Sequence, residues 1–245
     1  MYVIRIQTCL ATLAQYRASV VIWTLVAGGG GEVGGYSEGE FAAYYLAWIL
    51  VRHFTVAIRP DTIEKRVSRG EFSPLLMQPV HPIHGDIGDI IALKLFVLPT
   101  VVITLVALMI IFPPTFHLEW WSIPAFVITI LLAFPIRFLF TWILGLVAFW
   151  TTWARSIYGV FTVAEIFLTG RLAPLALLPV WAQLLASFLP FRWMIVFPVE
   201  VLIGKVTLDA VLIGVGIQVV VLVVLVLLLD KVWHAAVRRY AAVGG

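Results

Sequence analysis

The stretch from Ala210 to Leu229 carries no charged residue and consists mostly of Val and Leu. A helix needs about 20 such residues to cross the roughly 30 Å hydrocarbon core of a bilayer. This stretch therefore predicts a membrane span. Composition agrees, because 62% of the 245 residues are hydrophobic and only 12% are charged, about half the charged share of a soluble domain. A water-soluble globule and a disordered chain are both excluded.

Further apolar stretches predict an all-α fold, a polytopic transmembrane bundle of about six spans that forms a single domain, residues 1–245. Such stretches lie at residues 41–58, which carries Arg52 and His53 near one end, and at residues 95–112, 123–150 and 154–169. Near the end of the first of these, Arg52 is expected to reach out to the lipid headgroups.

The N-terminal part is less regular. Residues 18–58 are assigned the first two spans, although residues 18–27 are too few for an ordinary crossing before four glycines. Residues 1–17 are predicted to form a short interfacial helix. A cleaved signal peptide is the alternative for this end of the chain.

Basic residues predict the orientation of the bundle. They gather in residues 59–94 and in the tail, residues 230–245, which places both segments in the cytoplasm, and the N-terminus carries Arg5 and Arg17 before any acid. Both termini are therefore expected inside. The net charge of +3 is spread between apolar runs, so it indicates topology and no nucleic-acid partner.

An uncharged stretch from Leu172 to Phe191 fits poorly as a span, because proline removes a helical hydrogen bond. An even number of crossings must separate the two cytoplasmic segments. We therefore expect a re-entrant hairpin from the outer face before the last span, within residues 95–229. The residues that define this element are Gly170, Pro174, Pro179, Pro190 and Phe191.

Two charges fall inside predicted spans, where an unpaired charge is costly. Arg137 lies 15 residues before Thr152 and Glu165 lies 13 residues after it. At about 1.5 Å per residue they reach similar depth on antiparallel helices. We predict an ion pair between the fourth and fifth spans. Alternatively, these two residues would form the relay of an ion channel or proton-coupled carrier.

Metal and disulfide chemistry is not indicated. Cys9 is the single cysteine, which permits no internal disulfide. His81, His84, Asp86 and Asp89 lie close together in the sequence, but Pro82 and Gly85 interrupt the helical spacing that a shared metal would need, so no metal site is predicted. Instead, Asp86 is expected to cap the helix that leads into the third span. An intramembrane enzyme is disfavoured because no predicted span pairs Ser with His.

The segment after Ile58 predicts a short amphipathic helix. Pro60 suits a first helical turn, Asp61 and Glu64 lie near its positive end, and Ile63 and Val67 are four residues apart. The helix is either a linker that lies on the membrane or a docking helix for a soluble partner.

Residues 69–83, with the sequence RGEFSPLLMQPVHPI, are followed further on by LTG at 168–170, LPF at 189–191 and FP at 197–198. In this order the chain resembles permease subunits of type-2 (ABC-2-like) ATP-binding-cassette exporters, in the daunorubicin or viologen exporter-like branch. The resemblance implies six spans, a cytoplasmic coupling segment (residues 59–94) between the second and third spans, and a broken re-entrant element before the last.

The resemblance also implies partners. A second permease copy or a homologous permease would complete the pore in a prokaryotic cytoplasmic membrane, and a hydrophobic or amphipathic substrate would be exported. The sequence has no Gly-x-x-x-x-Gly-Lys-Ser/Thr motif, so ATP and Mg²⁺ are expected in separate ATPase subunits, and the chain is expected to be no enzyme and to hold no cofactor.

The docking helix is expected to seat its apolar face in a groove of the ATPase. Replacing Ile63 and Val67 with Asp should then abolish stimulated ATP turnover without unfolding the spans. The expected contact residues are Asp61, Ile63, Glu64, Val67, Arg69, Gly70, Glu71, Leu75 and Leu76.

Overall fold

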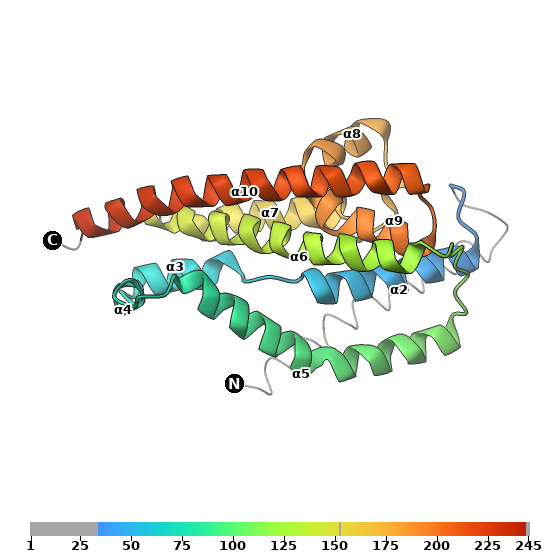
Figure 1. The fold of residues 1–245 in the computed structure, drawn as a ribbon, viewed down its shortest axis with the longest axis horizontal. Helices are drawn as coiled ribbons and strands as arrows, with labels where there is room; N and C mark the ends of the chain where they lie inside the picture. The colour runs from blue at the N-terminus through green and yellow to red at the C-terminus, as the bar shows by residue number, and fades with distance from the viewer. Residues whose placement is uncertain (1–33, 152, 244–245) are drawn as a thin grey trace.

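Helices make up the computed structural model of the protein, which describes residues 34–151 and 153–243 (Figure 1). Within these residues no strand occurs. The predicted interfacial helix and first span, residues 1–17 and 18–27, lie outside the described residues. The helices are α2 (Glu38–Thr55), α3 (Pro60–Ser68), α4 (Phe72–Leu76), α5 (Pro82–Ile111), α6 (Ser122–Leu146), α7 (Ala154–Leu168), α8 (Val180–Phe188), α9 (Phe197–Ile203) and α10 (Leu208–Val243), with short helices η1 (Val147–Phe149), η2 (Leu175–Leu177) and η3 (Arg192–Val196).

Four helical stretches in the described part of the chain are long and apolar enough to cross a membrane: Glu38–Ser68, Pro82–Ile111, Ser122–Phe149 and Leu208–Tyr240. α7 is a shorter apolar helix, and α8 with η3 and α9 forms a bent pair. The predicted all-α, polytopic bundle is confirmed.

The long helices run side by side between two ends of the molecule (Figure 1). At one end lie α3, α4 and the C-terminal end of α10, which we call the α4 end. At the other end lie α8, α9 and the first turn of α2, which we call the α8 end. The segment predicted to be cytoplasmic and the C-terminal tail thus share the α4 end, as an even number of crossings between them requires.

α2 forms the centre of the bundle. Its residues are buried along most of its length, among them Phe41, Tyr44 and Trp48. It packs against α5, α6, α9 and η3. A capping box fixes its first turn, because the Ser37 hydroxyl accepts from the Glu40 amide while the Glu40 carboxylate accepts from the Ser37 amide.

α5 begins earlier than predicted. Its N-cap is His81, whose Nδ1 accepts from the Ile83 amide at 3.2 Å, and Pro82 occupies the first helical turn. Residues 82–94, assigned to the coupling segment from sequence, therefore belong to this helix. Asp86 lies inside the helix and is no cap, because the capping position five residues earlier is already filled.

The expected break before the last span is present. α8 and the η3–α9 helix are bent relative to each other by 85°. Pro179 is the N-cap of α8, and Pro190 follows Leu189, the C-cap of this helix. Phe191 then packs against Phe161 of α7 and Phe140 of α6, with ring centroids 5.4 and 6.4 Å apart. The bent pair is therefore held against the bundle by an aromatic cluster.

Candidate functional site

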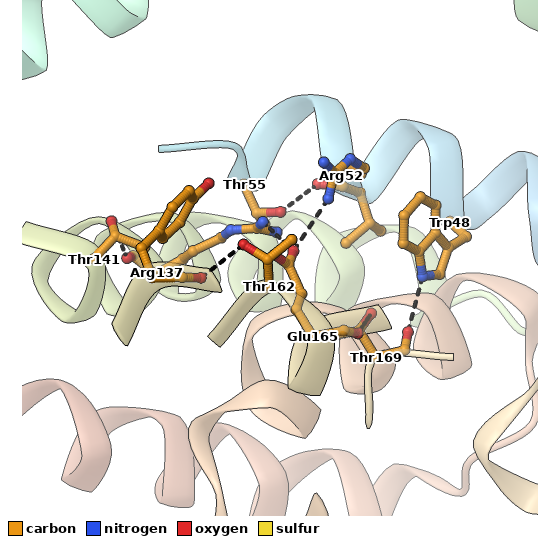
Figure 2. A network of polar contacts seen from close by, with 10 residues as sticks. Trp48, Arg52, Thr55, Arg137, Thr141, Thr162, Glu165 and Thr169 are labelled. Atoms are coloured by element: carbon orange, nitrogen blue, oxygen red, sulfur yellow. Dashed lines mark hydrogen bonds and ion pairs between the residues drawn. The ribbon is translucent and has the colours of Figure 1, made fainter. Parts of the chain in front are cut away.

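An ion cluster joins three helices in the interior of the bundle. Oε1 of Glu165, on α7, accepts from Nη1 of Arg52, on α2, at 3.1 Å, and also from Nη2 of Arg137, on α6. Figure 2 shows the two guanidinium groups converging on this carboxylate. The structure thus brings Arg137 and Glu165 together, as their matching depth indicates.

Arg52 takes part in this cluster, although the sequence placed its side chain among the headgroups. Its side chain is 20% exposed, whereas those of Arg137 and Glu165 are 6% and 10% exposed. Arg52 lies near the end of the predicted span, and a long basic side chain at such a position can reach the lipid headgroups. The third partner depends on how α2 packs beside α6 and α7, which sequence spacing does not reveal.

Aromatic side chains of α2 bind the end of α7. Trp48 Nε1 donates to the Thr169 carbonyl at 2.8 Å, the Tyr44 hydroxyl donates to the Gly170 carbonyl at 3.2 Å, and the Tyr45 hydroxyl donates to the Leu172 carbonyl at 2.9 Å. The last carbonyls of a helix have no partner within the helix. These donors satisfy carbonyls at that end, so α2 fixes both the charge and the end of α7.

Gly170 makes this contact possible. Its φ is +70°, and a Cβ there would collide with the Tyr44 hydroxyl. Only glycine adopts such a left-handed conformation readily. Gly170 is one of the residues predicted to form the re-entrant element. The backbone conformation where the chain leaves α7 therefore favours glycine at this position.

Two threonines that follow Arg137 and Glu165 by four residues form hydrogen bonds with the backbone one turn earlier. The Thr141 hydroxyl donates to the Arg137 carbonyl at 2.9 Å, and the Thr169 hydroxyl donates to the Glu165 carbonyl at 2.6 Å. Both bonds run back one helical turn. Figure 2 shows both threonines on the helices that carry Arg137 and Glu165, where their hydroxyls bond to backbone carbonyls and not to the charged groups.

The predicted docking helix, α3, turns its apolar face toward the protein itself. Ile63 is fully buried and packs on Gly145 of α6, where a Cβ would collide with it. Val67 is half-buried against the same core. The expectation that this face seats in a groove of a partner is corrected, because its leading residue is already covered by α6.

Asp86 links three helices at the α4 end. Its Oδ1 accepts from Nη1 of Arg66, on α3, at 2.7 Å, and its Oδ2 accepts from Nε1 of Trp142, on α6, at 2.9 Å. Asp86 is buried. Its two oxygens are therefore used to hold α3 and α6 against the start of α5.

The turn after α3 faces outward. Arg69, Gly70 and Glu71 are exposed, and Leu75 and Leu76 are half-buried. Asp61 is buried and accepts from Arg59 Nε at 3.1 Å and Lys65 Nζ at 3.3 Å. Glu64 is half-buried. Of the expected contact residues, the three in this turn are thus the most accessible.

Phe72 attaches this turn to the last helix. It is 1% exposed and its ring lies 6.1 Å from that of Trp233 and 6.4 Å from that of Tyr240. The Ser73 hydroxyl and the Tyr240 hydroxyl are hydrogen-bonded at 2.6 Å. The exposed turn is therefore connected to α10 as well as to α5 and α6.

Gln218 is an interior polar residue that the sequence analysis did not single out. Its Nε2 donates to the Thr129 carbonyl of α6 at 3.1 Å and to the Trp193 carbonyl of η3 at 2.9 Å. η3 is a π-helical turn, whose hydrogen bonds differ from those of an α-helix. A signal was present, since this glutamine is the one polar side chain in the uncharged stretch 210–229.

A comparison with models of protein families gives a match over most of the chain. The model of the family described as "ABC-2 family transporter protein" matches residues 13–244. Among curated proteins there is no significant match, and none was found among solved structures. The family match covers nearly the whole chain and includes the ion cluster, the α3–α4 region and the bent pair.

Proposed function

The chain belongs to the ABC-2 family of transporter membrane proteins, and on that basis we propose that it is the permease subunit of an ATP-driven exporter. It would work with separate ATPase subunits, which bind ATP and Mg²⁺, and with a second permease copy or a homologous permease in a prokaryotic cytoplasmic membrane. A hydrophobic or amphipathic molecule is the expected substrate. The family match favours this function over a channel or proton-coupled carrier built on Arg137 and Glu165.

The observation that carries the proposal is an exposed turn on a firmly anchored helix. Arg69, Gly70 and Glu71 are exposed at the α4 end. The helix before them is fixed by Ile63 on Gly145 and by the Arg66–Asp86 salt bridge. A push on the turn would reach α5 and α6 with little loss, because packed interiors are nearly incompressible.

In this arrangement the apolar residues of α3 pack within the permease and do not contact the ATPase. Ile63 would transmit movement to α6, and the exposed turn would contact the ATPase. Substitutions in the two places should therefore have different effects. Ile63→Asp should destabilise the membrane subunit itself, since it buries a charge without a partner.

The test uses the permease co-purified with its ATPase and reconstituted in lipid vesicles. Glu71→Lys, with a side chain that is 55% exposed, should lower ATP turnover or co-purification several-fold and leave the melting temperature of the permease unchanged. Glu119→Lys, exposed at the α8 end, is the matched control and should change neither. Equal behaviour of the two variants would place the ATPase contact elsewhere, and a chain that never co-purifies with an ATPase would contradict the proposed function.

A further inference from the structure

A third cation lies beside the two arginines of the ion cluster. The ammonium group of Lys94, on α5, donates to the Phe54 carbonyl of α2 and lies 3.7 Å from the centroid of the Phe134 ring of α6. Phe54 follows Arg52 by two residues, and Phe134 precedes Arg137 by one helical turn. Lys94 therefore contacts each of these helices next to its arginine.

The charges in this region do not balance within the described contacts. The carbonyl and the aromatic ring that the Lys94 ammonium group contacts bear no formal charge. Lys94 and Arg137 carry like charges. The carboxylate of Glu165 is shared by two guanidinium groups through the same oxygen. Positive charge is in excess, which is unfavourable at membrane depth.

Donors for a further acceptor are present. Arg137 is 5% exposed, and its Nη1 has no hydrogen-bond partner among the described residues. An ammonium group has three N–H donors, and Lys94 uses one of them on the Phe54 carbonyl. A buried donor without a partner is costly, so such groups in native proteins call for an acceptor.

Apolar surface continues from this point along α5. Ile91 and Leu95, which flank Lys94, are 45% and 65% exposed. A hydrocarbon chain could lie along them while its polar group meets the cations. An amphipathic anion matches both the charge and the surface.

From these contacts we infer that Lys94 and Arg137, together with Arg52, bind the oxyanion of an amphipathic molecule, a phosphate or carboxylate group on a hydrocarbon chain. This inference rests on the proposed function only in making that molecule the transported substrate. Binding itself requires no ATPase. The oxyanion could come from a lipid-like molecule or from a free ion, and the experiment separates the two.

The binding test uses the purified full chain in a neutral detergent, with dodecyl phosphate as the probe and dodecanol as its uncharged counterpart. We expect dodecyl phosphate to bind at least tenfold more tightly than dodecanol, as a charge-assisted hydrogen bond would provide. Lys94→Met should remove about tenfold of this preference, and Lys94→Arg should retain it. Lys231→Met, an exposed lysine on α10, is the control and should bind like the wild type.

Competition with inorganic phosphate identifies the source of the oxyanion. Displacement at millimolar concentration would support a site for the free ion, and no displacement would support one for the amphipathic molecule. Equal affinity for dodecyl phosphate and dodecanol, or unchanged binding by a folded Lys94→Met variant, would overturn the inference. Either result with intact ATP-driven coupling leaves the proposed permease function in place, whereas loss of coupling with intact binding contradicts only that function.

Discussion

Glu165 accepts from two guanidinium groups through one oxygen, and each group comes from a different helix. Removing one member of a buried ion pair costs more than the pair contributes, because the remaining charge loses its compensation. Here two cations would remain. The carboxylate is therefore the member of the cluster whose loss should matter most for stability.

We predict that Glu165→Gln destabilises the chain by about 3 kcal/mol. The measurement is thermal or denaturant unfolding in detergent, followed by tryptophan fluorescence. Glu71→Gln is the matched control, because its 3.8 Å contact with Arg69 is exposed and such surface pairs contribute about 1 kcal/mol or less. If the two variants unfold at the same temperature, the cluster does not stabilise the bundle.

At the scale of single helices, α5 depends on a histidine at its start. The Nδ1 atom of His81 accepts from the Ile83 amide, and its ring lies 4.2 Å from the ring of Trp233. Burial, with a smaller effect from the neighbouring His84, holds the pKa of His81 below its usual value of 6.5. The neutral ring is the form that can cap the helix, since a protonated Nδ1 accepts no hydrogen bond.

This predicts an acid-sensitive attachment of α5 to α10. Because the pKa of His81 is lower in the folded chain, the unfolded chain takes up the proton first as the pH falls below 6.5, and folding stability decreases. Unfolding of the wild type and His81→Asn should be compared between pH 7.5 and 5.5. Asparagine keeps a capping oxygen but does not titrate, so the variant should lose less stability over this range. Parallel pH profiles would assign the loss to other groups.

A second feature at this scale concerns α3, where periodicity alone misleads. Ile63 and Val67 fall on one face at helical spacing, and an apolar face on a helix outside the spans suggests a binding surface. The same face is satisfied within the chain, because Gly145 leaves room for Ile63 on α6. Amphipathic spacing specifies that a face is covered and does not specify what covers it.

At the scale of the whole molecule, the two ends of the bundle predict opposite accessibility. In a background with Cys9→Ser, we expect Glu119→Cys to react with a membrane-impermeant maleimide on intact cells and Glu71→Cys to react only after the cells are opened. Both side chains are exposed in the structure, so a difference in labelling would report the membrane side. Labelling of Glu71→Cys on intact cells would show that the α4 end faces the outside of the cell, which would contradict the proposed ATPase contact.

Several elements could be predicted because they depend on local pattern. The uncharged stretch 210–229 lies within α10, and the prolines around α8 mark the bend of 85°. The pairing of Arg137 with Glu165 followed from counting residues on antiparallel helices. The contacts of Arg52, Lys94, Asp86 and Gln218 could not be predicted in this way, since each depends on which helices pack side by side and on how those helices are rotated.

The amino-acid sequence alone determined that the chain crosses a membrane as helices and which segment breaks before the last helix. These follow from the transfer of apolar residues out of water and from backbone chemistry, both of which act within a helix length. Only the tertiary structure decided which side of α3 is free and which cations meet Glu165 and Lys94. Those outcomes depend on rotations and separations of packed helices, and no local pattern fixes them.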